Sequence, residues 1–345
     1  MRFGLFCSAQ ANSNMLGPET GQGFRDYLDY NVEAEALGYH STFSVEHHFT
    51  GWNQVSSTLM LLMALAMRTK TLRLGTAVMV LPWHNPVLLA EQAATLDLIS
   101  GGRLDFGIGK GYRHNEFLGF GIRQDEAEAR FEEALEVIKR SWVTRERFSH
   151  HGQYWNFEDI VVEPPPAQSP HPPLWVGAGN PVSIARAAER GFNLLLDQYA
   201  SPATLGERIG IFRKAREAKG LNFDPMQVTV ARQLYIAKDQ ADKEQALAKQ
   251  AAFTQRTINV ARAPNTQDGA TTGSHVLAYA NKAGATEENA LFGTPDEIVT
   301  MLEALHGAGV EYILLTISGG IEQLRRFAHD IMPAFAQAPT ARAVE

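Results

Sequence analysis

Two adjacent histidines and a glutamate, Glu46-His47-His48, are the side chains of this sequence best suited to acid–base chemistry. They come at the end of residues 39–45, which follow a helix stop at Gly38 and have the pattern of a β-strand. Loops after strand ends form the active sites of α/β proteins, and histidine exchanges protons near neutral pH. We therefore predict a proton-transfer site here. The alternative is that one of the two histidines is structural and binds the loop backbone.

A glycine-rich segment, Gly107-Ile108-Gly109-Lys110-Gly111, follows the strand predicted at residues 103–108. It does not complete the G-x-G-x-x-G spacing of a dinucleotide fingerprint, and no ribose-binding acid follows at the right distance. Its glycines let a ligand approach the backbone closely, and Lys110 adds a positive charge. An isolated lysine is usually a solvated surface charge. Lys110 therefore indicates a binding site only if other ligand-binding groups lie next to it.

A second turn with glycines precedes the helix predicted at residues 181–190. Asn180 suits the N-cap of this helix, and Ser183 brings a hydroxyl to its first turn. Free backbone N–H groups and the helix dipole make such an N-terminus a good anion site. Lys110 and Arg130, from the loop of the neighbouring strand, could complete a phosphate cradle. The alternative is a well-capped helix with nothing bound.

Strand and helix patterns alternate along the whole sequence. Strands are predicted at residues 2–8, 39–45, 72–80, 103–108, 174–177, 193–196, 228–237 and 310–317. Helices are predicted at residues 24–37, 56–67, 86–98, 126–142, 181–190, 204–219 and 295–306. This order predicts an α/β fold, a (β/α)8 TIM barrel, with insertions after strand four and between strands seven and eight. A doubly wound sheet is the alternative, because a count of strands does not prove closure.

The 345 residues, 45% of them hydrophobic, suffice for one large barrel domain, which we place at residues 1–337 with a disordered tail at 338–345. The first insertion, residues 145–173, is rich in proline and is expected to be irregular. In the second insertion, the small polar residues 269–274 suggest either a mobile lid over the barrel mouth or a plain surface loop.

Composition narrows the class of partner. The net charge of −7 argues against nucleic acid, whose phosphates require a basic surface. One cysteine, Cys7, excludes an internal disulfide framework and fits a reducing cytoplasm. The longest apolar stretch, residues 59–67, is far shorter than the ~20 residues of a bilayer span, and the N-terminal apolar run is too short for a signal peptide. We expect a cytoplasmic protein with a small-molecule substrate and no membrane partner.

Taken together, these segments resemble the bacterial luciferase-like, flavin-dependent monooxygenase family. The resemblance runs from Met1 to about Pro333 and rests on the order and spacing of several motifs. The motifs are Glu46–Phe49, Leu74–Ala77 with Leu81-Pro82, Gly102–Gly109, Ala187–Gly191 and Gly293–Glu297. The resemblance implies a (β/α)8 barrel that binds reduced FMN at its C-terminal mouth. It also implies a homodimer formed through barrel helices.

The resemblance also implies roles for single residues. His47 would be catalytic, with Glu46 or His48 orienting its loop, and a non-proline cis peptide is expected at Ala77-Val78 under the isoalloxazine ring. The implied cofactor-binding residues are Thr76, Ala77, Val78, Gly109, Lys110, Arg130, Gly179, Asn180, Ser183 and Gln198. Candidates for an apolar substrate wall, which could equally be packing residues, are Phe6, Cys7, Trp52 and Trp83. We expect no metal ligands.

The implied activity is that of a two-component monooxygenase. Reduced FMN would come from a separate NAD(P)H:flavin reductase, since the sequence has no fingerprint for holding NAD(P)H. O2 would form a C4a-peroxyflavin that oxygenates a small organic substrate. Gly109 and Lys110 stand where luciferase has a reactive cysteine and an arginine, and luciferase has a tryptophan near Gln198. These departures weigh against light emission and a long-chain aldehyde substrate.

Three other functions remain open at this point. The first is an F420-dependent hydride-transfer oxidoreductase of the same superfamily, which does not need oxygen. The second is a flavin-binding protein without turnover, against which the two histidines argue. The third, a metal hydrolase that uses His47 and His48, is weaker, because adjacent residues of a strand point to opposite faces.

Overall fold

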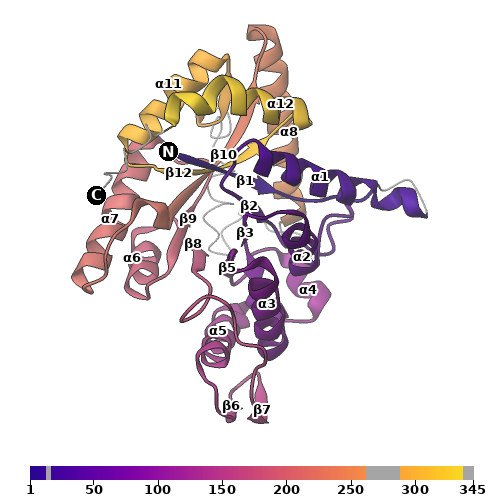
Figure 1. Cartoon of the computed structure of the whole chain (residues 1–345), viewed down its shortest axis with the longest axis vertical. Helices are drawn as coiled ribbons and strands as arrows, with labels where there is room; N and C mark the ends of the chain where they lie inside the picture. Colours follow the sequence, from indigo (N-terminus) through magenta and orange to yellow (C-terminus); the bar gives the residue numbers. More distant parts are fainter. Residues whose placement is uncertain (13–16, 262–287, 337–345) are drawn as a thin grey trace, which may run out of the picture.

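The computed structural model describes residues 1–12, 17–261 and 288–336 (Figure 1). Eight parallel strands form its centre. They are β1 (Arg2–Cys7), β2 (Ser41–Ser44), β3 (Arg73–Thr76), β5 (Leu104–Gly109), β8 (Leu174–Gly177), β9 (Asn193–Leu196), β10 (Val228–Ile236) and β12 (Tyr312–Ile317). β1 pairs with β2 and β12, and β10 pairs with β9 and β12, so the sheet closes on itself. The predicted (β/α)8 barrel is confirmed, and the doubly wound sheet is excluded.

Helices surround the barrel, and those at the seven predicted places are all found. The surrounding helices are α1 (Gln22–Ala36), α2 (Thr58–Arg68), α3 (Pro86–Ser100), α5 (Ala127–Val143), α6 (Pro181–Glu189), α7 (Pro202–Ala218), α8 (Gln240–Ala261), α11 (Pro295–Gly307) and α12 (Gly320–Arg326). Local sequence fixes several of their starts. The Asn85 side chain accepts hydrogen bonds from the first turn of α3, and Thr294 forms a capping box with Glu297 at the start of α11.

The third predicted strand, residues 72–80, is interrupted. It divides into β3 and β4 (Met79–Val80), with the predicted cis peptide at Ala77-Val78 between them. β4 then pairs with the end of β5. Glycines in β5 make room for this path: a Cβ at Gly107 would lie 1.8 Å from the Thr76 carbonyl oxygen, and one at Gly109 would lie 2.5 Å from Cγ2 of Val78. No side chain would fit at either position.

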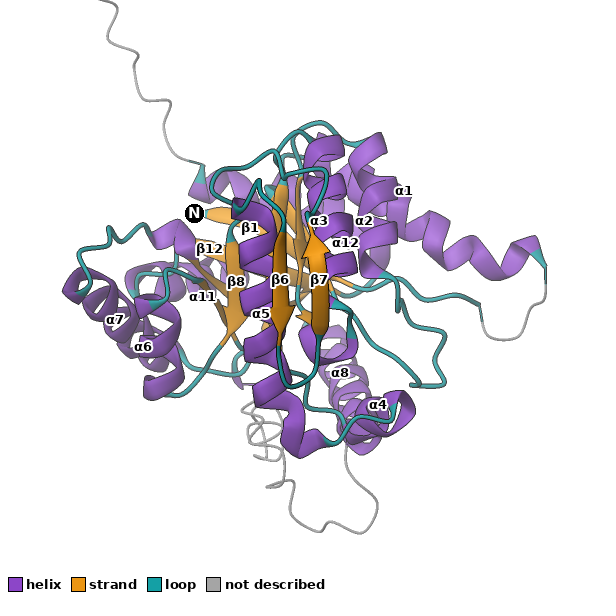
Figure 2. Cartoon of the chain, turned by 90° about the horizontal axis from the view of Figure 1, so that it is seen from below, coloured by secondary structure: helices purple, strands orange, loops and turns teal. Residues whose placement is uncertain are grey.

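The first insertion is more ordered than the sequence suggests. Its proline content predicts irregular chain, but it contains an antiparallel hairpin, β6 (Phe148–His151) and β7 (Asn156–Ile160), beside α5 (Figure 2). The Glu133 carboxylate of α5 accepts the backbone N–H groups of three residues in the hairpin turn, residues 153–155. This contact between distant segments, which no local pattern reveals, corrects the expectation of irregular structure.

Helices α8 and α12 have no counterpart among the predicted ranges, and neither do a short helix and a short strand. Helix α4 (His114–Phe120) follows β5 directly, and a short strand, β11 (Leu291–Gly293), pairs with the end of β10. The suggested lid at residues 269–274 and the tail at residues 338–345 lie outside the described residues.

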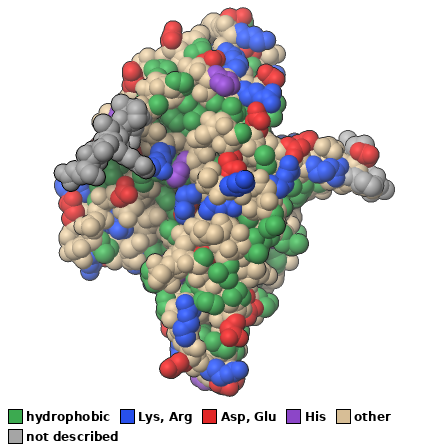
Figure 3. Space-filling view, in the orientation of Figure 1, with side chains coloured by type: hydrophobic (Ala, Val, Ile, Leu, Met, Phe, Trp, Pro, Cys, Tyr) green, Lys and Arg blue, Asp and Glu red, His purple; other side chains and the backbone are tan. Residues whose placement is uncertain are grey.

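Two charged residues at the starts of the neighbouring strands β3 and β5 have a structural role. Arg73 forms an ion pair with Asp105 at 2.7 Å, and the Trp175 indole donates to the same carboxylate. Acidic and basic side chains are interspersed over the face seen in Figure 3. Within residues 1–12, 17–261 and 288–336, no helix is long and apolar enough to cross a membrane. The same ranges contain no cluster of three His, Cys, Asp or Glu side chains suited to a metal ion.

Candidate active site

The Glu46-His47-His48 segment leaves β2 at the C-terminal end of the barrel, as predicted. The loop that follows folds back on the loop after β1, since the His47 N–H donates to the Val55 carbonyl and the Val55 N–H donates to the Ala9 carbonyl. Phe49 has a left-handed backbone, with φ of 54°. This conformation is uncommon for a bulky residue and often occurs at functional sites.

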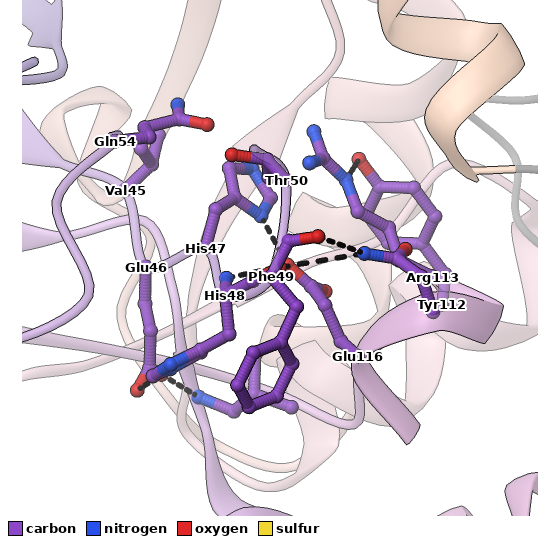
Figure 4. A network of polar contacts seen from close by, with 12 residues as sticks. Val45, Glu46, His47, His48, Phe49, Thr50, Gln54, Tyr112, Arg113 and Glu116 are labelled. Carbon is purple, nitrogen blue, oxygen red and sulfur yellow. Dashed lines mark hydrogen bonds and ion pairs between the residues drawn. The ribbon is translucent and has the colours of Figure 1, made fainter. Parts of the chain in front are cut away.

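His47 forms a pair with a glutamate from the segment that follows β5, two strands further along the barrel. Its Nδ1 lies 3.0 Å from Oε1 of Glu116, which is in α4, and the backbone N–H of His48 donates to the same oxygen (Figure 4). The Glu116 side chain is 2% exposed and that of His47 is 16% exposed. An ionised Glu116 accepts the Nδ1 proton, which leaves Nε2 as the nitrogen that can exchange a proton with a ligand.

The surroundings keep His47 neutral. Burial lowers the pKa of His47 below its ordinary value of 6.5, and the nearby charge of Arg113 lowers this pKa further. The hydrogen bond to Glu116 acts in the opposite direction but does not outweigh them. A neutral imidazole with a held Nδ1 can accept a proton at Nε2 near pH 7.

Glu46 points away from this pair and forms a separate hub. Its buried carboxylate accepts the Val80 N–H at 2.7 Å and lies 2.7 Å from Nε2 of His84 and 3.1 Å from Nε2 of His48. Burial acts to raise the pKa of Glu46, but the hydrogen bonds from His48, His84 and Val80 together bring it below 4.5. Glu46 therefore joins the His47 loop to β4, and His48 is held within this hub.

The predicted phosphate-binding residues lie in two groups. Asn180 caps α6 by accepting the Ser183 N–H at 2.9 Å. Lys110 pairs with Glu128 at 2.6 Å, and Arg186 of α6 binds the same carboxylate at 3.0 Å, so the loop after β5 is linked to α6.

Arg130 belongs to the other group. It pairs with Glu126 at 2.9 Å and lies over the Tyr154 ring, with 4.3 Å between the guanidinium carbon and the ring centroid. It therefore faces the hairpin in the structure.

The other predicted cofactor residues follow the barrel wall. The Thr76 hydroxyl donates to the Gly107 carbonyl at 2.7 Å, next to Ala77, Val78 and Gly109. Gly179 is buried just before α6. Gln198, at the end of β9, donates to the Tyr199 hydroxyl at 2.7 Å and accepts from Gln233 at 3.0 Å.

The four residues of the predicted substrate wall are placed in different surroundings. Phe6 and Cys7 pack against the hydrophobic core, and burial raises the pKa of the Cys7 thiol to about 12, with a small opposing effect from Thr42. Trp52 lies under Arg256 of α8, with 4.7 Å from the guanidinium carbon to the ring centroid. Trp83 stacks on Phe120 of α4, with 5.3 Å between centroids.

Sequence reasoning assigned no role to Arg113, His84 or Glu116. The available signal was position: all three follow the ends of strands three and four, where a barrel gathers its functional side chains. Several buried polar atoms at this end of the barrel lack a hydrogen-bond partner among the described residues. They are Nη1 of Arg113, Nε1 of Trp83, Oε1 of Gln54 and Oε1 of Gln233. Buried polar groups without partners mark places that a ligand can complete.

These features fit a phosphorylated, planar cofactor. The glycines of β5 let the cis-peptide segment lie close against that strand. The α6 N-terminus and Lys110 suit a phosphate, and donors and acceptors without a partner among the described residues remain for a polar ring. The arrangement is that of an enzyme site in the mouth of a TIM barrel.

The profile of the luciferase-like monooxygenase family matches residues 1–312. The chain belongs to this family, and the predictions of family and of an oxidoreductase are confirmed. A flavin-dependent trigonelline monooxygenase, oxygenase component, from Acinetobacter baylyi is 28% identical over 365 residues, 99% of this chain and 98% of that protein. An uncharacterized protein of Sinorhizobium fredii is 32% identical over 219 residues, 63% of this chain and 62% of that relative's length.

A solved structure agrees over the whole fold. The monooxygenase RslO1 from Streptomyces bottropensis has a TM-score of 0.79 at 28% identity, with 97% of this chain and 100% of that chain covered. The relatives also include an F420-dependent glucose-6-phosphate dehydrogenase of Amycolatopsis mediterranei, 30% identical over 190 residues, 53% of this chain and 54% of that enzyme. Flavin-dependent and F420-dependent enzymes are therefore both among the relatives.

Proposed function

We propose that the protein is the oxygenase component of a two-component monooxygenase that uses reduced FMN and O2 to oxygenate a small organic substrate. The observation that carries the proposal is the neutral His47, held by Glu116 in the barrel mouth next to the cis peptide Ala77-Val78. The relative that matches nearly the whole chain is named as such an oxygenase component. A separate NAD(P)H:flavin reductase is the source of reduced FMN.

The protein's own residues bind, orient and move protons. Lys110 and Arg186, with the N–H groups at the α6 N-terminus near Asn180 and Ser183, hold the phosphate. The wall formed by Ala77, Val78 and Gly109 supports the ring, and Thr76 and Gln198 border it. Bound reduced FMN supplies the electrons that activate oxygen.

His47 accepts and returns a proton at Nε2 next to the reacting atoms. Glu116 keeps its ring in place, and Glu46 positions the loop that carries it. Phe49 and Phe120 pack against each other and against the His48 ring, and so support the loop that carries His47.

Binding measurements test the cofactor. Anaerobic titrations with reduced FMN, riboflavin and reduced F420 are expected to give saturable binding of FMN, and a Lys110→Met variant should lose most of the preference for FMN over riboflavin. Tight binding of F420 with no binding of FMN would move the assignment to a hydride-transfer enzyme. Binding of FMN without oxygen uptake in the presence of a reductase would favour a flavin-binding protein without turnover.

We also propose a homodimer that buries the outer faces of α2 and α3. These faces expose Met60 (76%), Met67 (72%) and Leu88 (55%), together with Leu98 and Ile99. Exposed apolar patches of this kind mark contact surfaces. Light scattering at micromolar concentration is expected to show a dimer that a Met60→Glu, Met67→Glu double variant converts to a monomer. A monomeric wild type would contradict this.

The single cysteine supports a cytoplasmic location.

A further inference from the structure

Arg113 is a buried positive charge with few polar contacts among the described residues. The residue is 3% exposed, and it directly precedes α4. Among the described residues, its Nη1 has no hydrogen-bond partner, and the one hydrogen bond of its guanidinium runs from Nε to the Tyr112 hydroxyl at the long distance of 3.4 Å. Leaving a buried charged group without partners is costly, so such a group normally has a ligand or a counter-ion.

The nearest functional carboxylate does not serve as that counter-ion. Glu116, three residues later, is used by Nδ1 of His47 and by the backbone N–H of His48. Figure 4 shows the Arg113 guanidinium beside the Tyr112 hydroxyl, directed toward the side of His47. Its charge is near enough to act on the His47 imidazole. The free positive charge therefore faces the place where a substrate would meet the proton-transfer group.

We propose that Arg113 and Tyr112 bind a carboxylate of the organic substrate, so that the enzyme acts on an organic acid. This rests on the proposed oxygenase function. The Tyr112 hydroxyl accepts from Nε of Arg113, so its own proton is free to be donated. Nη1 of Arg113 is a charged donor without a partner among the described residues, and the Tyr112 O–H beside the guanidinium is a second donor. Both groups suit a carboxylate oxygen. The bound carboxylate supplies the missing counter-charge and fixes the substrate relative to Nε2 of His47.

Small carboxylates and their neutral amides test the site without knowledge of the natural substrate. Acetate, benzoate and phenylacetate, with acetamide, benzamide and phenylacetamide as matched controls, are titrated by calorimetry into the protein with and without oxidised FMN. At least one carboxylate is expected to bind at least 10-fold more tightly than its amide. An Arg113→Met variant should weaken it about 10- to 100-fold, and Tyr112→Phe by less, as befits the loss of one donor.

Further variants separate this site from the cofactor site. Lys110→Met should weaken FMN and leave the carboxylate affinity unchanged, whereas Arg113→Met should do the reverse. If carboxylates bind no better than amides, the proposal is overturned. It is also overturned if Arg113→Met weakens reduced FMN instead, which would assign the guanidinium to the flavin. The carboxylates are also measured on flavin-free protein. A failure to bind FMN would therefore count against the proposed oxygenase function without deciding the carboxylate site.

One measurement reads the wild type itself and uses a variant only to assign a signal. In the wild type with 15N-labelled arginine, carboxylates should shift the Nε–H signal of Arg113 and raise the pKa of His47, since they neutralise the charge that lowers it. Arg113→Gln identifies the signal. An Arg113 signal that no carboxylate moves contradicts the proposal.

Discussion

Two buried arginines, Arg103 and Arg113, show how differently the two ends of this barrel are built. Arg103 uses all three guanidinium nitrogens: it donates to the Ser100, Leu72 and Ala66 carbonyls and to both oxygens of Thr69. Arg113 is more buried, at 3% against 9% exposed, yet its guanidinium has a single long hydrogen bond within the part of the chain that the structure describes. Arg103 completes the ends of α2 and α3, whereas Arg113 faces the mouth. A buried charge whose hydrogen bonds are all formed serves the fold, whereas a buried charge without partners is a candidate for ligand binding.

The two adjacent histidines differ in the same way: one is held by protein partners and the other keeps an atom for a ligand. This difference predicts the largest effect on activity. His48 is held by Glu46, whereas His47 keeps Nε2 for proton transfer. His47→Ala should lower kcat/KM for an accepted substrate by about 10²–10⁴-fold, the usual contribution of a proton-transfer group. His48→Ala, the matched control, should act mainly on stability. A reductase-coupled assay of product formation measures both, and equal losses of activity would contradict the distinction.

The pH profile sharpens this prediction. His47 has to be neutral to accept a proton, and its pKa lies below 6.5. Activity should therefore persist below pH 6.5 and fall only at more acidic pH. A Glu116→Gln variant removes the negative charge that raises this pKa, so the acidic limb should move to still lower pH. An acidic limb above pH 6.5 in the wild type would show that His47 is not kept neutral as described.

Next in size is the effect of the two arginines on folding. Arg103→Met leaves several buried carbonyls without donors and should lower the free energy of unfolding by roughly 3 kcal/mol or more. Arg113→Met removes a charge that has few partners, so the same free energy should change by less than about 1 kcal/mol or rise. Urea unfolding of the two variants makes the comparison. A strong loss of stability in Arg113→Met would mean that this arginine serves the fold.

Glu46 gives an effect of intermediate size with a defined pH dependence. Glu46→Gln removes the charge that binds His84, His48 and the Val80 N–H, at a cost of about 1–3 kcal/mol. Because the folded pKa of Glu46 lies below 4.5, its contribution is fully present above pH 4.5 and is lost as pH falls through the folded pKa. The stability difference between wild type and variant should therefore shrink in acid. A constant difference would refute the assignment.

The smallest stability effect is expected at the half-exposed pair of Lys110 and Glu128. Surface ion pairs of this kind contribute about 0–1 kcal/mol, so Glu128→Gln should hardly change the free energy of unfolding. The variant frees Lys110 and Arg186 for phosphate, so the affinity for FMN should rise. An ion-pair energy of about 0–1 kcal/mol corresponds to a rise of about 2- to 5-fold. The matched variant Glu126→Gln, next to Arg130, should leave FMN binding unchanged. Weaker binding in Glu128→Gln would contradict a phosphate site at Lys110.

Sequence was a good guide where the chemistry is local. The strands at residues 174–177 and 193–196 are found as predicted, and Asn180 caps α6 because its side chain acts within one turn. The hairpin around β6 depends on Glu133, which lies in another element. Likewise, the pairing of His47 with Glu116 joins residues 69 positions apart, and only the closed barrel brings them together.

Rapid mixing of the anaerobic complex of the protein and reduced FMN with oxygenated buffer tests the central claim most directly. The account predicts a long-lived species with an absorbance distinct from that of oxidised FMN, and a markedly shorter lifetime in His47→Ala. Immediate formation of oxidised FMN in the wild type, or a lifetime that His47→Ala leaves unchanged, would contradict it.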